Sequence, residues 1–413
     1  MLKTRSARHY ATLKEPCTGA NPGFLPVMGA ALIALLSSPL AIAQSGLYFV
    51  PLITVEEVYD DNIFFQQSED EVSDFITRVS PQLDVGFESE TLNWLLSYRN
   101  DAEWYRDLSD LDSTTARGFG LGRIEYTPDR RLTLRGETQY VQTNSVQDLT
   151  LTPGGGIPGR VGRAEAERWL FGAGAGYRFS PRWNGDIDVT WVDDELIDFS
   201  TNETLSGVTQ LEQILTPARS LLYGYQYRNY EFENDVGVDP IERISESEDS
   251  NTLWLGLTQE LSERSELEVR AGPRFSSSET DPYFLFDWRR NYERGSTSIR
   301  ALWDETTLLG EVGRQESRSI YATWTHEFSA DLEVSGTAGY AYLSGEGFST
   351  DITSFDVSGI YRFNRAIYLT ARYGFNIQEQ DPARIQGARV TRNVVSIAIT
   401  FTRPRRGAER SSS

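Results

Sequence analysis

Residues 392–403 read RNVVSIAITFTR, and this stretch decides the fold. Its side chains alternate: small or polar residues fall on one face, and the other face carries Val395, Ile397, Ile399 and Phe401. Neighbouring side chains of a β-strand point to opposite faces of the sheet. A half-buried strand of a soluble protein alternates in the same way. The stretch alone therefore predicts a strand, and the rest of the chain must decide what surrounds it.

The same alternation recurs along the chain, in segments separated by two kinds of connection. Short connections such as 127–130, 180–182, 216–219 and 328–331 contain residues that favour turns. They alternate with longer acidic or Gly-rich connections at 65–72, 107–113, 144–163, 193–203, 233–250, 345–351 and 379–389. Outer-membrane barrels have short periplasmic turns and longer outside loops, so this alternation also predicts sidedness.

On this basis the segments between the connections are the expected strands. They lie near 47–58, 72–87, 91–105, 114–127, 131–144, 164–179, 182–193, 204–216, 219–232, 250–262, 264–277, 282–292, 296–306, 315–328, 331–344, 352–363, 366–378 and 390–403. We predict an all-β fold, a transmembrane antiparallel barrel of about eighteen strands. Sixteen is the alternative count, because 282–306 can also be part of a loop. Two soluble β-sandwiches are the alternative architecture.

The N-terminal segment has the features of a secretory signal. It combines a basic start, the apolar stretch VMGAALIALL at 27–36 and the small-x-small site at 41–43. A membrane anchor is the alternative, but the apolar stretch is shorter than the ~20 residues of a spanning helix. We expect residues 1–43 to be a cleaved signal peptide, residues 44–403 to form the barrel and residues 404–413 to be a short basic disordered tail. The expected location is the cell outer membrane.

Composition excludes several classes of function. The net charge of −21 becomes −24 once the +3 of residues 1–43 is removed, which excludes a general affinity for nucleic acid. The single cysteine, Cys17, lies in the expected signal, so the barrel would have neither disulfides nor Cys-ligated metal. A low content of hydrophobic residues, 39%, suits a barrel because only alternate residues meet lipid.

Facing can be assigned in the clear strands. In 264–277, Leu267 and Val269 would face lipid while Glu268 and Arg270 would face the lumen. The inner aromatic girdle would consist of Tyr126, Phe179, Phe328, Phe363 and Phe401, at the ends with short turns.

Arginines recur in the lumen register and form a candidate path for anions. They are Arg99, Arg135, Arg178, Arg228, Arg270, Arg274, Arg300 and Arg372, and acidic residues such as Glu125, Glu137, Glu266 and Glu268 accompany them. The functional interpretation is a basic ladder that guides an anionic solute, as charged rings do in anion-selective pores. The alternative is that the arginines form salt bridges within the lumen.

We expect no catalytic site, no metal site and no cofactor. His326 is the one histidine beyond the signal, and its register places it beside Trp324 and Phe328 on the lipid face, away from a catalytic partner in water. The acidic run from Glu231 to Asp249 has no calcium-loop spacing and is interpreted as a solvated loop. The alternative for this run is a cation-bridged contact with surface polysaccharide or lipid headgroups.

One motif connects the chain with a known family. At 58–64 the sequence reads VYDDNIF, with Tyr59, Asp60, Asp61 and Asn62 at its centre. With Ser80-Pro81-Gln82-Leu83, the stretch LSYR at 96–99, the stretch YERGS at 292–296 and the closing strand, the chain resembles the outer-membrane β-barrel porin-2 family over roughly residues 47–402. Many members of that family are encoded beside exopolysaccharide or exosortase genes. The resemblance implies an outer-membrane location and a context of polysaccharide export, and it supplies no catalytic residues.

The sequence therefore predicts a passive outer-membrane pore of a Gram-negative cell, linked to exopolysaccharide export. Expected partners are outer-membrane lipid, lipopolysaccharide and an anionic exopolysaccharide, and the sequence leaves the oligomeric state open. A general small-solute porin and a non-conducting structural or adhesion barrel are the alternatives. Residues 144–163 form the expected lid or plug.

Overall fold

The computed structural model describes residues 46–67, 69–145, 163–197, 200–235, 243–276, 279–307, 313–345, 348–382 and 388–403. Among these residues, a short 3-10 helix, η1 (Ser109–Leu111), is the one helical element, and all other elements are β-strands. The strands are β1 (Leu47–Asp60), β2 (Asp74–Glu88), β3 (Leu92–Tyr105), β4 (Ser113–Tyr126), β5 (Leu132–Ser145), β6 (Arg163–Ser180), β7 (Trp183–Leu196), β8 (Ser200–Thr216), β9 (Arg219–Asp235), β10 (Arg243–Ser262), β11 (Ser265–Ser276), β12 (Thr280–Tyr292), β13 (Gly295–Thr307), β14 (Arg314–Glu327), β15 (Leu332–Gly345), β16 (Phe348–Asn364), β17 (Ile367–Pro382) and β18 (Ala388–Thr402). The expected signal peptide, the tail and most of the expected plug lie outside the described residues.

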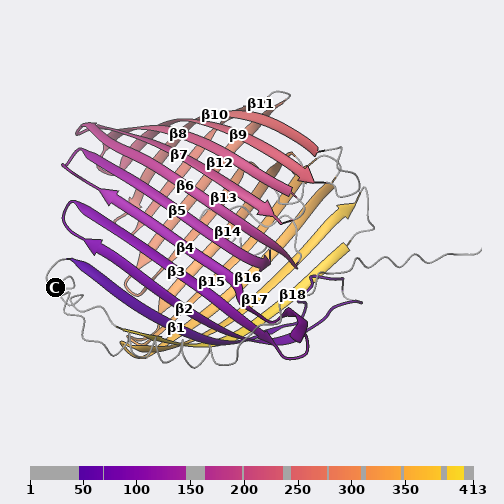
Figure 1. The fold of residues 1–413 in the computed structure, drawn as a ribbon. Helices are drawn as coiled ribbons and strands as arrows, with labels where there is room; N and C mark the ends of the chain where they lie inside the picture. Colours follow the sequence, from indigo (N-terminus) through magenta and orange to yellow (C-terminus); the bar gives the residue numbers. More distant parts are fainter. Residues whose placement is uncertain are drawn as a thin grey trace, which may run out of the picture. The chain divides into compact units, whose positions relative to one another are not determined.

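The strands form one closed antiparallel sheet. Each strand pairs with the next along the chain, and β18 returns to β1, where Val55 lies opposite Ile399. The eighteen strands surround a lumen and run side by side with a common tilt (Figure 1). Closure leaves the sheet without an unpaired edge, which a membrane-spanning sheet requires. The predicted all-β barrel and its strand count of eighteen are confirmed, including the two strands of 282–306.

The two ends of the barrel differ in their connections. Short turns of two to five residues join β2 to β3 and the later even-numbered strands to their successors, at the left of Figure 1. At the other end lie the connection of 61–73 and the segment with η1, and we call this the loop end. Three of the long connections were predicted wrongly. Strand β7 extends to Leu196 and β8 starts at Ser200, β9 extends to Asp235 and β10 starts at Arg243, and β15 extends to Gly345 while β16 starts at Phe348.

The described part of the acidic run is therefore strand, while residues 236–242 of it lie outside the described residues. Glu231 lies within β9, and Glu246, Glu248 and Asp249 lie within β10, paired with it in regular register. The sequence pattern misled us because acidic residues outside the bilayer can continue a strand as easily as they can form a loop.

The alternation predicted for the closing strand is confirmed. In β18, Ile397 is 55% exposed on the outer face, whereas its neighbours Ser396 and Ala398 are 6% and 7% exposed on the inner face. Leu255 of β10 is 64% exposed, on the same outer face. A soluble protein would bury such residues, so this continuous apolar exterior is the outer-membrane type of barrel surface.

Aromatic side chains mark the outer face near the short turns. All five members of the predicted girdle are exposed, namely Tyr126, Phe179, Phe328, Phe363 and Phe401. Rings at this level suit the boundary between hydrocarbon and headgroups. Among the described residues, no helix is long and apolar enough to cross a membrane.

Candidate functional site

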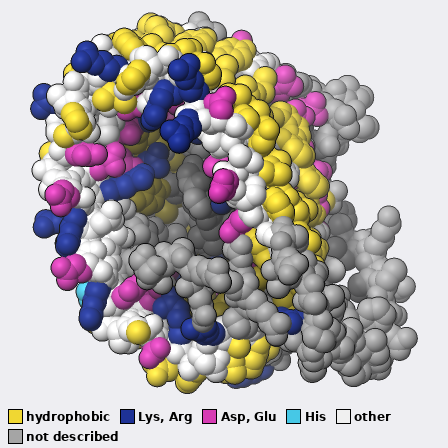
Figure 2. All heavy atoms as spheres, turned by 90° about the vertical axis from the view of Figure 1, so that its left-hand side faces the viewer, with side chains coloured by type: hydrophobic (Ala, Val, Ile, Leu, Met, Phe, Trp, Pro, Cys, Tyr) yellow, Lys and Arg dark blue, Asp and Glu magenta, His cyan; other side chains and the backbone are white. Residues whose placement is uncertain are grey.

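The inner wall of the barrel is the candidate functional site. Seen from the end with the short turns, Arg, Asp and Glu side chains surround a central hollow, and hydrophobic side chains cover much of the outside (Figure 2). Three parts of this wall have distinct geometry: the contacts that close the barrel, an ion cluster near the loop end and a recess near the short turns.

The VYDDNIF motif joins the first strand to the last. Arg392 of β18 donates from Nε to both Oδ atoms of Asp60, at 3.0 and 3.1 Å, and its guanidinium lies 4.2 Å from the ring centroid of Phe65. Asn393 donates its backbone N–H to Asp61 at 2.7 Å. We call these the closure contacts, since they tie the connection after β1 to the strand that completes the barrel.

The remaining motif residues order the same connection. The Asn62 side chain is fully buried and donates to the carbonyl oxygens of Gln66 and Thr391 at 2.7 and 3.0 Å. Phe65 has a positive φ of 54°, a conformation that is uncommon for a bulky residue. Tyr59 lies on the outer face with its ring centroid 4.9 Å from that of Phe75. The structure thus places all four motif residues at the seam of the barrel, where their contacts are structural.

Near the loop end, buried charges from several strands meet inside the barrel. The ion cluster consists of three arginines and two acids: Arg228, Arg274, Arg314, Asp304 and Glu305. Arg228 Nη2 lies 2.7 Å from Asp304 Oδ2, and Arg274 Nε lies 3.2 Å from Glu305 Oε2. The side chains of Arg274 and Glu305 are each 1% exposed. Charges this buried require oppositely charged partners, and each has at least two, although Arg274 Nε forms no hydrogen bond to any of its partners.

The strand order shows that the ion cluster bridges the inner face. Arg228 is on β9 and Asp304 is on β13, four positions apart in the sheet. Adjacent strands lie about 4.8 Å apart, so a flat sheet would separate them by roughly 19 Å. The 2.7 Å contact between Arg228 and Asp304 therefore requires the sheet to fold sharply between β9 and β13. Consistent with this, β13 is not paired with β12 beyond Trp303, although it stays paired with β14 as far as Thr307. The last residues of β13, with the start of β14 beside them, therefore lean over the inner face; below, the hairpin end means these described residues, 304–307 and 314.

The structure gives the eight predicted arginines different surroundings. Arg228 and Arg274 belong to the ion cluster. Arg99 lies 3.1 Å from Asp101 and over the ring of Phe119, and Arg270 pairs with Glu268 and lies over Trp254. Arg372 lies 2.7 Å from Asp356. Arg178 and Arg300 are exposed on the inner wall, and no ion pair with another described residue is formed by either. Most of the arginines thus face a carboxylate at contact distance.

Arg135, the last of the eight predicted arginines, lines a recess in the inner wall near the short turns. The lumen recess has a volume of about 560 Å³ and includes Glu125, Arg135, Gly174 and Asp188, which lie in one row across β4 to β7. Arg135 reaches over β6 to contact Asp186 at 3.0 Å and Asp188 at 3.2 Å. This reach depends on Gly174, because a Cβ there would lie 2.0 Å from Asp188 Oδ1 and 3.3 Å from Arg135 Nε.

Sequence reasoning missed the ion cluster as a unit. Strict alternation places Asp304 inward but assigns the neighbouring Glu305 to lipid. The structure turns both carboxylates towards arginines because the hairpin end leaves regular pairing after Trp303. The one usable signal was the adjacent pair of acids following an apolar strand, which cannot both point into lipid.

The remaining predicted sites can be placed simply. His326 lies on the outer face, with its ring centroid 4.7 Å from that of Phe328 and 6.0 Å from that of Trp324. In the part of the chain that the structure describes, no group of three or more His, Cys, Asp or Glu residues is arranged to hold a metal ion. The absence of a catalytic function remains a prediction.

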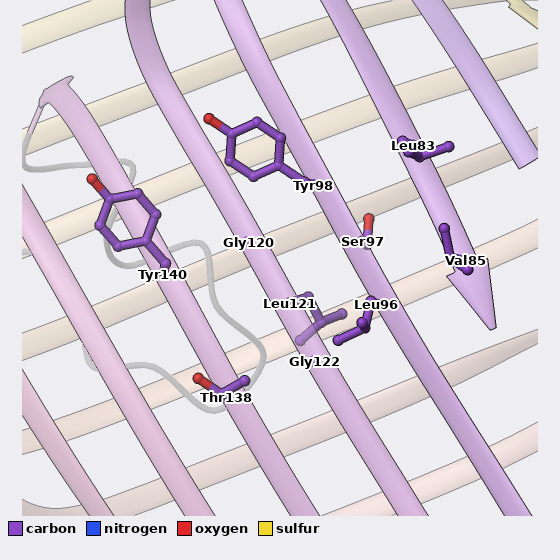
Figure 3. A pocket seen from close by; sticks show the side chains of 10 residues that line it. All are labelled: Leu83, Val85, Leu96, Ser97, Tyr98, Gly120, Leu121, Gly122, Thr138 and Tyr140. Carbon is purple, nitrogen blue, oxygen red and sulfur yellow. The ribbon is translucent and has the colours of Figure 1, made fainter. Parts of the chain in front are cut away.

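The outer face has a shallow apolar groove over β2 to β5. Its volume is about 310 Å³, and it runs over β4, where Gly120 and Gly122 present no side chains (Figure 3). The rings of Tyr98 and Tyr140 stand on either side of Gly120 in this view. The groove is part of the apolar exterior of the barrel. None of the residues that line it is acidic, basic, His or Cys, so it is not a candidate catalytic site.

Comparison with solved structures finds distant neighbours of this chain. A mutant of the ferric enterobactin receptor from Pseudomonas aeruginosa is 8% identical, with a TM-score of 0.45 over 87% of this chain and 81% of that one. The FrpB iron transporter from Neisseria meningitidis is 10% identical, with a TM-score of 0.43 over 85% and 81%. The siderophore receptor PirA from P. aeruginosa is 7% identical, with a TM-score of 0.43 over 86% and 80%. No family model and no curated protein matches the chain, so membership of the porin-2 family stays a prediction.

Proposed function

We propose that the chain forms a passive pore in a bacterial outer membrane, through which polar solutes diffuse. The observation that carries this proposal is the division of the barrel wall: apolar side chains outside, and exposed charged side chains inside near the short turns. A lumen lined by accessible charges holds water, and a barrel of eighteen strands belongs to the size class that encloses a channel unless loops fill it. Outer-membrane lipid and lipopolysaccharide are the partners proposed for the apolar exterior.

The test is the single-channel conductance of the refolded chain, residues 44–413, in planar bilayers. We expect discrete current steps that scale with salt concentration. Heat-modifiable migration on gels identifies the folded barrel. If the folded barrel inserts into vesicles but does not conduct, the proposal is contradicted. An equal mass of heat-unfolded protein in the same detergent serves as the control for leaks.

The finer proposal is that the solute is a secreted exopolysaccharide. It is supported by the resemblance of the VYDDNIF motif and by the supply of hydrogen-bond donors and acceptors on the inner wall. Deletion of the gene should abolish secretion of the polymer, whereas normal secretion with reduced uptake of small solutes would favour a general porin. The predicted preference for anions is tested separately, by the reversal potential under a salt gradient.

A non-conducting structural barrel is the second candidate, and the ion cluster favours it. The folded sheet and the leaning hairpin end bring β9 and β13 into contact and fill part of the inner face with protein. If this filling extended across the lumen, the barrel would be stable and closed. Absence of conductance in the intact chain, with conductance restored by shortening the β13–β14 hairpin, would identify a barrel that is plugged at this point.

A further inference from the structure

We propose that the lumen recess is a binding subsite for one or two units of an uncharged saccharide. The proposal rests on the proposed pore only for access, because it concerns the lining of the inner wall. Four features support it: the size of the recess, the pattern of its charges, its glycine floor and its position near the short turns.

The size of the lumen recess suits a small polar ligand. Its volume of about 560 Å³ lies within the ~300–1,000 Å³ of small-molecule sites. The charged groups that line it are accessible, since the side chain of Arg123 is 54% exposed and that of Arg135 is 42% exposed. A solute in the lumen can therefore reach these groups without unfolding any part of the wall.

Donors and acceptors alternate across the recess in two parallel rows. One row is Glu125, Arg135, Gly174 and Asp188, and the other is Arg123, Glu137, Gly172 and Thr190. Arg123 lies 3.2 Å from Glu137, and Arg135 lies within 3.2 Å of two aspartates. Each arginine is thus neutralised but keeps further N–H groups, and each carboxylate keeps further lone pairs. Sugar hydroxyls both donate and accept, so they match such a surface.

The charge balance argues against an anionic ligand at this point. The recess is lined by Glu88, Glu125, Glu137 and Asp188, against two arginines. An anion would have to displace a carboxylate from Arg123 or Arg135 and would then face the remaining acids. An uncharged ligand neither has to displace a carboxylate nor is repelled by the remaining acids.

The floor of the recess is formed by glycines. Gly172 and Gly174 sit at the centres of the two rows, and a Cβ at Gly172 would meet nothing closer than 3.9 Å. Larger residues are therefore sterically acceptable at Gly172, and they would fill the recess. The ring of Tyr48 lies over Gly86 at the edge of the recess and adds an apolar surface of the kind that can cover a sugar face.

The recess opens near the short turns, which outer-membrane barrels place on the periplasmic side. A subsite at this mouth would be the first contact for a polymer that leaves the periplasm. Binding at such a site must be weak, because transport requires release.

The experiment measures binding of maltohexaose to the folded barrel in detergent by isothermal titration calorimetry. We expect saturable millimolar binding, weakened at least tenfold by Gly172→Leu, which fills the recess, and by Arg135→Gln, which removes donors. Gly374→Leu is the matched control: it adds the same side chain to the inner wall at β17, where a Cβ would approach Asp356 Oδ2 at 3.4 Å. Its binding should equal that of the wild type.

Three outcomes would overturn the proposal: no binding, equal binding by the Gly172→Leu variant, or tighter binding of an oligogalacturonate or a chitosan oligomer than of maltohexaose. Conductance separates this proposal from the proposed pore. An open channel whose current maltohexaose does not reduce contradicts the subsite and leaves the pore standing. Saturable binding by a barrel that does not conduct supports the subsite and contradicts the pore.

Discussion

The ion cluster and the lumen recess contain the same kinds of residue in opposite surroundings. Arg274 in the ion cluster is 1% exposed and touches three acids, whereas Arg135 in the lumen recess is 42% exposed and touches two. A buried ion pair loses hydration that only its partners replace, so it fixes the fold. An exposed pair contributes little to stability and remains available to a solute. Burial, more than residue type, therefore separates structural arginines from candidate binding arginines in this barrel.

The largest effect is expected from Arg274→Met. The substitution keeps the length of the side chain but leaves Asp304 and Glu305 buried with fewer partners. Removing one member of a buried ion pair typically costs about 3–5 kcal/mol. We expect a loss of that order in the free energy of unfolding, measured by urea denaturation of the barrel in lipid vesicles.

The matched control for this prediction is Arg289→Met on β12. Arg289 pairs with Asp287 at 3.0 Å but is 66% exposed. The loss there should stay below about 1 kcal/mol, as for other exposed pairs. Similar losses in the two variants would show that burial does not distinguish the two regions.

The closure contacts should produce the next largest effect. Asp60→Asn removes the charge that Arg392 contacts through two of its nitrogens. Hydrogen bonds to charged groups contribute about 1.5–3 kcal/mol, so we expect a loss in this range. Hydrogen exchange should rise first in β1 and β18, the strands that form the seam. Glu57→Gln, an exposed neighbour on the outer face, is the control and should leave exchange in both strands unchanged.

The sequence predicted the barrel better than it predicted the site, for a physical reason. Alternation is a local property, so Ile397 outward and Ser396 inward could be read directly. The partners of Arg228 could not be predicted in this way. Asp304 is 76 residues away in the sequence, and the two residues meet only because the sheet folds between β9 and β13. Arg135 was assigned to the lumen correctly in register, but its reach over Gly174 to Asp188 depends on two strand registers that no local pattern specifies.

A smaller effect on stability, with a clear effect on transport, is expected for Arg178 and Arg300. Both are exposed on the inner wall, and neither forms an ion pair with a described residue. The double variant Arg178→Glu, Arg300→Glu should change the free energy of unfolding by less than about 0.5 kcal/mol, as surface substitutions usually do. It should shift the reversal potential in a KCl gradient towards that of K⁺. An unchanged reversal potential would remove these two arginines from the predicted path for anions.

The smallest effect concerns the outer face near the loop end, and it should be stabilising. Glu203 of β8 lies directly opposite Asp193 of β7 and Glu231 of β9 in the strand register, so three carboxylates sit in one row. Like charges directly opposite in a sheet are unfavourable by about 0.2–1 kcal/mol.

Glu203→Gln should therefore raise the free energy of unfolding by an amount in that range, with the gain shrinking as salt screens the repulsion. Glu212→Gln is the control on the same strand. Its carboxylate accepts a hydrogen bond from Asn184 at 2.8 Å, as that of Glu203 does from Trp191 at 3.4 Å, but the residues opposite Glu212 are the uncharged Asn184 and Leu222. A gain for Glu203→Gln that does not depend on salt would mean that repulsion is not its cause. None of the three carboxylates in this row is buried as Glu305 is. Burial of charge predicts a large cost for replacing Arg274, and the absence of such burial predicts that Glu203 can be replaced without a loss of stability.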